Sequence, residues 1–117
     1  MDYKVDKPIY LQIADYVCER ILQGVWKADE RIPSVRELSV TLEVNPNTIV
    51  KSFEYLENKQ IIFQKRGIGY FVESNGLQRI QENYKTEFLN EDLPNLFKKM
   101  HWLEISIDEI VARHAKQ

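Results

Sequence analysis

The sequence has little cysteine and histidine, no long apolar run and no marked excess of charge of either sign. The single cysteine, Cys18, excludes an internal disulfide and a paired-thiol metal or redox site, which leaves an ordinary packing role for it. The two histidines, His101 and His114, have no Cys, Asp or Glu grouping around them at metal-ligand spacing. No nucleophile has a base assigned near it, so we expect no enzyme, no cofactor and no metal site.

The sequence also lacks a stretch approaching the roughly 18 apolar residues that a membrane span needs. Its first residues, 1–4, lack the basic start and apolar middle of a signal peptide. We therefore expect a soluble, cytoplasmic protein with no membrane partner. A chain of 117 residues with 44% hydrophobic content predicts one modest core and a small extension.

The net charge of −2 removes the simplest argument for nucleic-acid binding, because such proteins are generally basic overall. Residues 58–72 nevertheless carry Lys59, Lys65 and Arg66 and no acidic residue. Acidic groups elsewhere can face away from a duplex, since their repulsion is largely screened beyond about 8 Å at physiological salt. This basic stretch is either a surface for phosphates or a solvated turn with no partner.

Two helices are predicted before residue 43. Apolar residues recur every four positions from Ile9 to Ile21, and Gly24 follows as a residue that commonly ends a helix. After a connector over residues 25–33, Ser34 and Glu37 have the spacing of a capping box. That box predicts a second, short helix over residues 35–42.

A third helix is predicted from Pro46, because Asn45 suits the capping position and proline is well tolerated in the first turn. Ile49, Phe53 and Leu56 fall on one face, which predicts that this face is buried. The polar side chains of the opposite face are then expected to point outward; they are Asn47, Thr48, Lys51 and Tyr55.

A β-hairpin follows, because residues 61–65 and 70–72 are rich in β-branched and aromatic side chains around Gly67-Ile68-Gly69. Helix, helix, helix and hairpin in this order predict a winged helix-turn-helix. The fold class is therefore mainly α with a small β-hairpin. We expect this DNA-binding domain to span residues 1–74, and Asn75-Gly76 to mark its boundary.

Residues 75–117 return to helical spacing, with Pro94 expected to kink or divide the helix. Ser106 and Glu109 predict a second capping box, which opens a last helix. Two amphipathic segments of this size cannot bury their own apolar faces, so we expect them to form a homodimer. The side chains expected at that interface are Leu77, Ile80, Tyr84, Phe88, Leu96, Phe97, Ile107, Ile110 and Val111.

The predicted third helix suits the major groove, where the first turn of a reading helix meets base edges. An asparagine amide there can both donate to and accept from adenine, although Asn45 itself is better explained as a helix cap. The fork geometry of Arg36 suits a phosphate or a guanine edge, and the other cations suit phosphates. The expected DNA-contacting residues are Ser34, Arg36, Asn45, Asn47, Thr48, Lys51, Lys65, Arg66, Gly67 and Gly69.

Four motifs in order resemble the successive signatures of GntR-family transcriptional regulators. They are Pro8-Ile9-Tyr10-Leu11-Gln12-Ile13, Ile32-Pro33-Ser34-Val35-Arg36-Glu37-Leu38, Val44-Asn45-Pro46-Asn47-Thr48-Ile49 and Gly67-Ile68-Gly69-Tyr70-Phe71-Val72. The Asn-Pro-Asn-Thr helix start and the short tail are most similar to the YtrA-type subfamily, whose C-terminal part is a small helical dimerisation region.

The resemblance implies a repressor that binds operator DNA as a homodimer and often controls neighbouring transport genes. Arg36, Thr48 and the glycine turn match the family pattern. Many members carry arginine in place of Pro46 and of Val50, and those two contacts do not transfer to this chain.

Two questions stay open from the sequence. A winged-helix scaffold that binds protein is the main alternative function, suggested by the acidic balance. An effector is unknown, because about 40 tail residues leave little room for a pocket of ~300 Å³ within one subunit. A cleft between subunits, or between the tail and the winged helix, remains open as an effector site.

Overall fold

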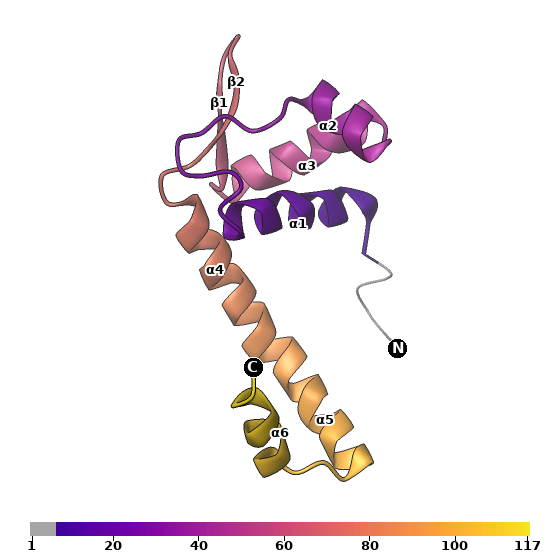
Figure 1. Ribbon diagram of the computed structural model, residues 1–117. Helices are drawn as coiled ribbons and strands as arrows, with labels where there is room; N and C mark the ends of the chain where they lie inside the picture. The colour runs from indigo at the N-terminus through magenta and orange to yellow at the C-terminus, as the bar shows by residue number, and fades with distance from the viewer. Residues whose placement is uncertain (1–6) are drawn as a thin grey trace. The chain divides into compact units, whose positions relative to one another are not determined.

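The computed structural model describes residues 7–117 (Figure 1). The chain forms two compact units that divide between Gln81 and Glu82. The first unit holds α1 (Ile9–Leu22), α2 (Val35–Leu42), α3 (Pro46–Asn58), β1 (Ile62–Lys65) and β2 (Gly69–Val72). A helical tail follows β2. Its first residues, up to Gln81, belong to the first unit, and the remainder, from Glu82 onward, forms the second unit. No helix within residues 7–117 is long and apolar enough to span a membrane.

The predicted starts and ends of the first three helices are confirmed. Gly24 follows α1 with φ +78°, a backbone conformation that glycine adopts with little strain. Ser34 and Glu37 form the complete capping box of α2, and the side chain of Asn45 accepts a hydrogen bond at the start of α3. These three local signals therefore fix the lengths and spacing of the helices.

The core of the first unit is built on α3, which packs against α1, α2 and β1. The face predicted to be inward is confirmed, since Ile49, Phe53 and Leu56 are fully buried. Cys18 is buried in α1, as expected for a packing residue. Ile9 was expected to begin the buried face of α1 but is exposed, so that face starts at Ile13.

The hairpin pairs antiparallel, with Ile62 opposite Val72 and Lys65 opposite Gly69, which confirms the predicted wing. The connector before α2 also joins this sheet, a pairing that the sequence did not predict. The amide of Asp29 donates to the carbonyl of Val72 at 2.8 Å, and that of Ile32 donates to the carbonyl of Tyr70 at 2.9 Å. This pairing fixes the connector along β2.

The tail begins with α4 (Gly76–Glu87), continues through a π-helical segment, η2 (Phe88–Asp92), and ends with α5 (Leu93–Leu103) and α6 (Ile107–His114). The predicted effect of Pro94 is confirmed by the irregular segment before it. Proline has no amide hydrogen and its ring crowds the carbonyl four residues earlier. The helix widens there, and the amide of Leu93 donates to the carbonyl of Phe88 five residues back.

Only half of the second predicted capping box forms. The hydroxyl of Ser106 accepts from the amide of Glu109 at 3.2 Å. The carboxylate of Glu109 instead accepts from Nε of Arg113 at 3.3 Å, one turn further along α6. The prediction of a full box was therefore wrong, because an ion pair within the helix takes the carboxylate.

Candidate nucleic-acid interface

The first turn of α3 presents polar groups to solvent. Oδ1 of Asn45 accepts from the amide of Asn47 at 2.8 Å, so Asn45 acts as the cap, while its side-chain amide group is left free to donate. Asn47 is exposed and Thr48 is half-buried. Because a helix N-terminus carries free amides and a partial positive charge, this turn favours an anion or a polar edge beside it.

The start of α2 places a cation next to a rigid cap. The hydroxyl of Ser34 accepts from the amide of Glu37 at 3.1 Å, and the carboxylate of Glu37 accepts from the amide of Ser34 at 2.9 Å. These hydrogen bonds hold the pKa of Glu37 below its usual value. Arg36 is exposed beside them and has no ion pair among the described residues.

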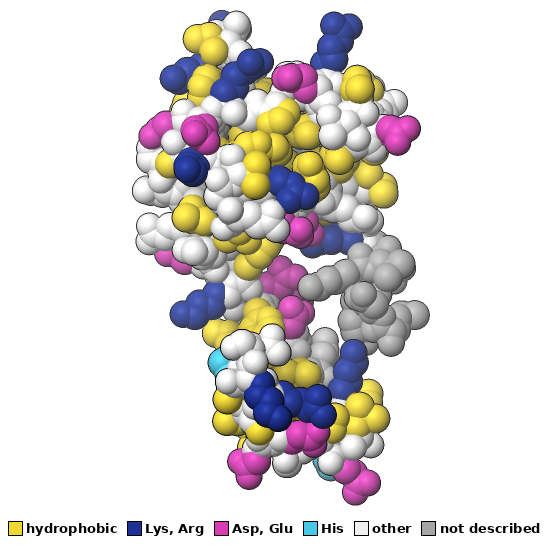
Figure 2. Space-filling view, in the orientation of Figure 1, with side chains coloured by type: hydrophobic (Ala, Val, Ile, Leu, Met, Phe, Trp, Pro, Cys, Tyr) yellow, Lys and Arg dark blue, Asp and Glu magenta, His cyan; other side chains and the backbone are white. Residues whose placement is uncertain are grey.

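The hairpin carries the second cationic group. Nζ of Lys65 lies 4.5 Å from the centre of the Phe71 ring, and Arg66 at the turn is exposed. The turn depends on glycine, since φ is +77° at Gly67 and +148° at Gly69. Figure 2 shows Lys and Arg side chains gathered at the hairpin end of this unit. This end is therefore locally positive, although the net charge of the chain is negative.

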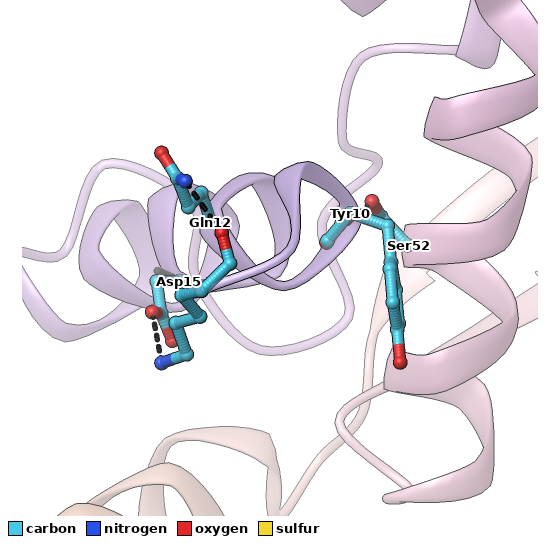
Figure 3. A network of polar contacts seen from close by, with 5 residues as sticks. Tyr10, Gln12, Asp15 and Ser52 are labelled. Carbon is cyan, nitrogen blue, oxygen red and sulfur yellow. Dashed lines mark hydrogen bonds and ion pairs between the residues drawn. The ribbon is translucent and has the colours of Figure 1, made fainter. Parts of the chain in front are cut away.

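Lys51 lies over the start of α1, with its Nζ 4.2 Å from the centre of the Tyr10 ring. The same seam is held by buried Ser52, which lies beside Tyr10 (Figure 3). The single hydroxyl proton of Ser52 is shared between the carbonyl of Tyr10, 2.7 Å from Oγ, and that of Thr48, 3.0 Å from it. Tyr55, expected to face outward, is half-buried edge-on to Tyr10, and its burial raises the pKa of its hydroxyl. The α1–α3 seam thus orients the exposed edge of α3.

The sequence analysis missed Arg31, which lies against the glycine turn. Its Nε is 2.7 Å from the position that a Cβ would take on Gly69, and its backbone forms a bridge with Phe71. Arg31 stands in an irregular connector, where neither helical nor strand periodicity gives a signal. Only the pairing of that connector with β2 brings it to the hairpin.

The expected dimerisation residues divide into three groups in the single chain, buried, half-buried and exposed. Ile80 is fully buried in the single chain, so it packs within its own chain. Tyr84 and Ile110 are half-buried. The exposed members are Leu77, Phe88, Leu96, Phe97, Ile107 and Val111. Three exposed apolar neighbours were not among the expected residues: Leu89, Trp102 and Leu103.

The described residues offer no metal centre, since no three His, Cys, Asp or Glu side chains within 7–117 are placed to hold an ion. The groups present at the α3 start and the hairpin are amides, hydroxyls and cations. Their chemistry is that of hydrogen bonding and of phosphate attraction.

Comparison with protein families matches residues 9–72 to the model described as "Bacterial regulatory proteins, gntR family". Among curated proteins, the chain is 32% identical over 110 residues to the HTH-type transcriptional repressor YtrA of Bacillus subtilis. The match covers 94% of this chain and 84% of that protein.

Two solved structures are also similar. A putative transcriptional regulator of the GntR family from Bacteroides thetaiotaomicron is 43% identical with a TM-score of 0.75, over 93% of this chain and 95% of that one. The AraR(DBD), solved in complex with operator ORX1, is 28% identical with a TM-score of 0.57, over 61% of this chain and 86% of that one.

Proposed function

The chain belongs to the GntR family of bacterial regulatory proteins, and from this premise we propose that it is a homodimeric repressor of a palindromic operator. As a member of the family it is a DNA-binding transcriptional regulator and not an enzyme. The proposal concerns which residues meet the DNA, how two copies are arranged and what the binding does. It rests chiefly on one observation, the exposed first turn of α3 in the same unit as a cationic hairpin.

The first turn of α3 is proposed to read base edges in the major groove. Asn47 can form a bidentate pair with adenine, and Thr48 can contact an edge or a methyl group. Asn45 adds its free amide donors while it caps the helix. Asn45 and Asn47 are exposed at the start of α3, where the backbone amides of a helix are free to donate.

The cations beside this turn are proposed to bind phosphates. Arg36 would contact the backbone next to α2, and Lys65 and Arg66 would contact the strand that the wing crosses. Lys51, whose Nζ lies over the ring of Tyr10, would contact phosphate at the α1–α3 seam. Gly67 and Gly69 would let the turn approach closely, and Ser34 would hold α2 in place through its cap. The similarity to the AraR(DBD), which was solved on operator DNA, supports this mode of docking.

Homodimerisation is proposed through the apolar surface of the tail, defined by Phe88, Leu96, Phe97, Ile107 and Val111. These side chains are exposed in the single chain, and so large an apolar set is uncommon on a monomer. A twofold dimer would present two α3 helices to half-sites about one helical turn or more apart. That symmetry is the reason to expect a palindromic operator.

Repression would follow if the operator overlaps a promoter, because a bound dimer would block RNA polymerase. The similar B. subtilis protein is named a transcriptional repressor, which supports repression over activation for this chain. The resemblance to the YtrA-type subfamily supports neighbouring transport genes as targets, with the protein acting in the cytoplasm.

The test is transcription in vitro from the promoter adjacent to the gene, with purified full-length protein. We expect the transcript to fall as protein is added, and a triple variant, Arg36→Ala, Lys51→Ala and Arg66→Ala, to lose this effect while remaining folded. Unchanged or increased transcript with the wild-type protein would overturn repression. A triple variant that still represses would overturn the assigned DNA contacts and favour a protein-binding role.

A further inference from the structure

Arg31 occupies a position between the two proposed contact elements of the winged-helix unit. Its backbone bridges Phe71 in β2, and the next residue, Ile32, donates to the carbonyl of Tyr70. The start of α2 follows three residues later at Ser34, so the connector spans from the wing to the cap of α2. Arg31 is therefore fixed at its backbone beside the wing and not on a free loop.

The side chain of Arg31 lies in the space that a side chain at position 69 would take. A Cβ on Gly69 would stand 2.7 Å from Nε of Arg31 and 3.6 Å from its Cζ. Real Cβ atoms do not approach another heavy atom this closely, so any other residue at position 69 would displace the guanidinium. By contrast, a Cβ on Gly67 would meet nothing within 4 Å.

The charge of Arg31 is not neutralised by a carboxylate. Arg31 is exposed, and no carboxylate in residues 7–117 forms an ion pair with it. The acidic group near it is Glu37, whose pKa Arg31 helps to lower, but the carboxylate of Glu37 is bonded to the amide of Ser34. An exposed guanidinium with no ion pair among residues 7–117, on a backbone that pairs with β2 of the cationic hairpin, has the properties of an anion contact.

We infer that Arg31 is a phosphate-contacting residue beside the wing turn, and that glycine at position 69 leaves room for its side chain. This role rests on the proposed function. It adds a further phosphate contact, made from the connector, to those proposed for the wing and for α2. Gly69 then has two roles, a backbone conformation with φ +148° and a space for Arg31.

The experiment measures fluorescence anisotropy of two labelled duplexes of about 30 bp over a series of salt concentrations. One is the promoter fragment that the full-length protein binds best, and the other is a scrambled duplex of the same composition. Arg31→Ala should bind both duplexes about tenfold more weakly and reduce the slope of log K against log salt by about 0.9. Arg31→Lys should restore the slope, and Lys27→Ala, on the same connector, should leave it unchanged.

The role of Gly69 is tested by a double-mutant cycle. Gly69→Ala should weaken binding strongly in the wild-type background and much less in the Arg31→Ala background. Backbone strain is the same in both backgrounds, so the difference reports displacement of the guanidinium. Equal losses in the two backgrounds would overturn the requirement for room at position 69.

The salt slope and the melting temperature of Arg31→Ala distinguish a phosphate contact from a structural role. The wild-type affinities for the two duplexes test the proposed function separately. An unchanged salt slope for Arg31→Ala, or a loss of affinity that follows a lowered melting temperature, would overturn the contact. If the wild-type protein bound the two duplexes equally, the operator-specific function would fail. The slope on the scrambled duplex would still test Arg31 in that case.

Discussion

Asn45 and Asn47 lie two residues apart at one helix start, yet their side chains have different surroundings. Oδ1 of Asn45 is committed to the amide of Asn47, whereas the side chain of Asn47 is exposed in the first turn of α3. A capping hydrogen bond stabilises the helix whether or not DNA is present. Base reading is therefore tested at Asn47 and not at Asn45, where loss of the cap would confuse the result.

Asn47→Ala is expected to weaken binding to the preferred operator by about 1–3 kcal/mol, roughly 5- to 150-fold, because a bidentate base contact is lost. Binding to a random duplex should change by less than about twofold, since phosphate contacts remain. Asn58→Ala, at the exposed far end of the same helix, is the matched control. Equal weakening on both duplexes would argue against base reading by Asn47. Titration by fluorescence anisotropy makes the comparison.

The residues that could be predicted from sequence are those whose environment is local. Ser34 with Glu37, and Asn45 with Pro46, act within four positions of the chain, so their spacing alone locates them. Arg31 could not be found in this way. Its place is set by pairing with β2, about 40 positions further along the chain.

At the scale of elements, the start of α2 contains a charge that is linked to stability. The amide and hydroxyl of Ser34 lower the pKa of Glu37 from its usual 4.5 in the folded protein. A carboxyl whose pKa is lowered on folding stabilises the fold above its unfolded pKa, and this contribution is lost as pH falls through the folded pKa. The capping box should therefore weaken in acid.

Glu37→Gln should melt at a lower temperature than the wild type near neutral pH, because the charged half of the capping box is gone. The difference between the two proteins should shrink as pH falls from about 6 to about 3, where Glu37 of the wild type becomes protonated. Thermal melting followed by circular dichroism across this range measures the difference. A constant difference at every pH would contradict the assigned role of the carboxylate.

The helices and strands could be predicted where apolar residues recur periodically or where a glycine turn separates two strand-like runs. The hairpin follows from two β-rich runs around Gly67-Ile68-Gly69, and its register agrees with that turn. The π-helical segment before Pro94 was predicted only as a kink or division, since proline specifies a disruption but not how the backbone absorbs it. The second capping box failed because Arg113 competes for the carboxylate of Glu109.

At the scale of the whole molecule, dimerisation would supply the second half-site that one winged-helix unit lacks. The expectation came from apolar residues with too little partner surface, and the structure leaves most of them exposed in the single chain. Ile80 differs because it is fully buried within its own chain, which the helical spacing could not distinguish from an interface position. A pattern of apolar residues predicts burial but not which surface provides it.

Val111→Lys should weaken dimerisation by about tenfold or more, because the interface would have to bury a charge. Val40→Lys in α2 is the matched control, since Val40 is 73% exposed and Val111 is 59% exposed. Sedimentation equilibrium at micromolar concentration should show dimer for the wild type and for the control variant. Monomer for all three proteins, or dimer for Val111→Lys at wild-type strength, would contradict the proposed interface.

We propose that the exposed α3 start and the cationic hairpin together recognise a particular DNA sequence. The most direct measurement is a titration of the full-length protein against its adjacent promoter fragment and against a scrambled duplex at about 0.15 M salt. We expect affinity for the promoter to be at least about a thousandfold higher than for the scrambled duplex. Equal affinity for the two duplexes at this salt concentration would contradict it.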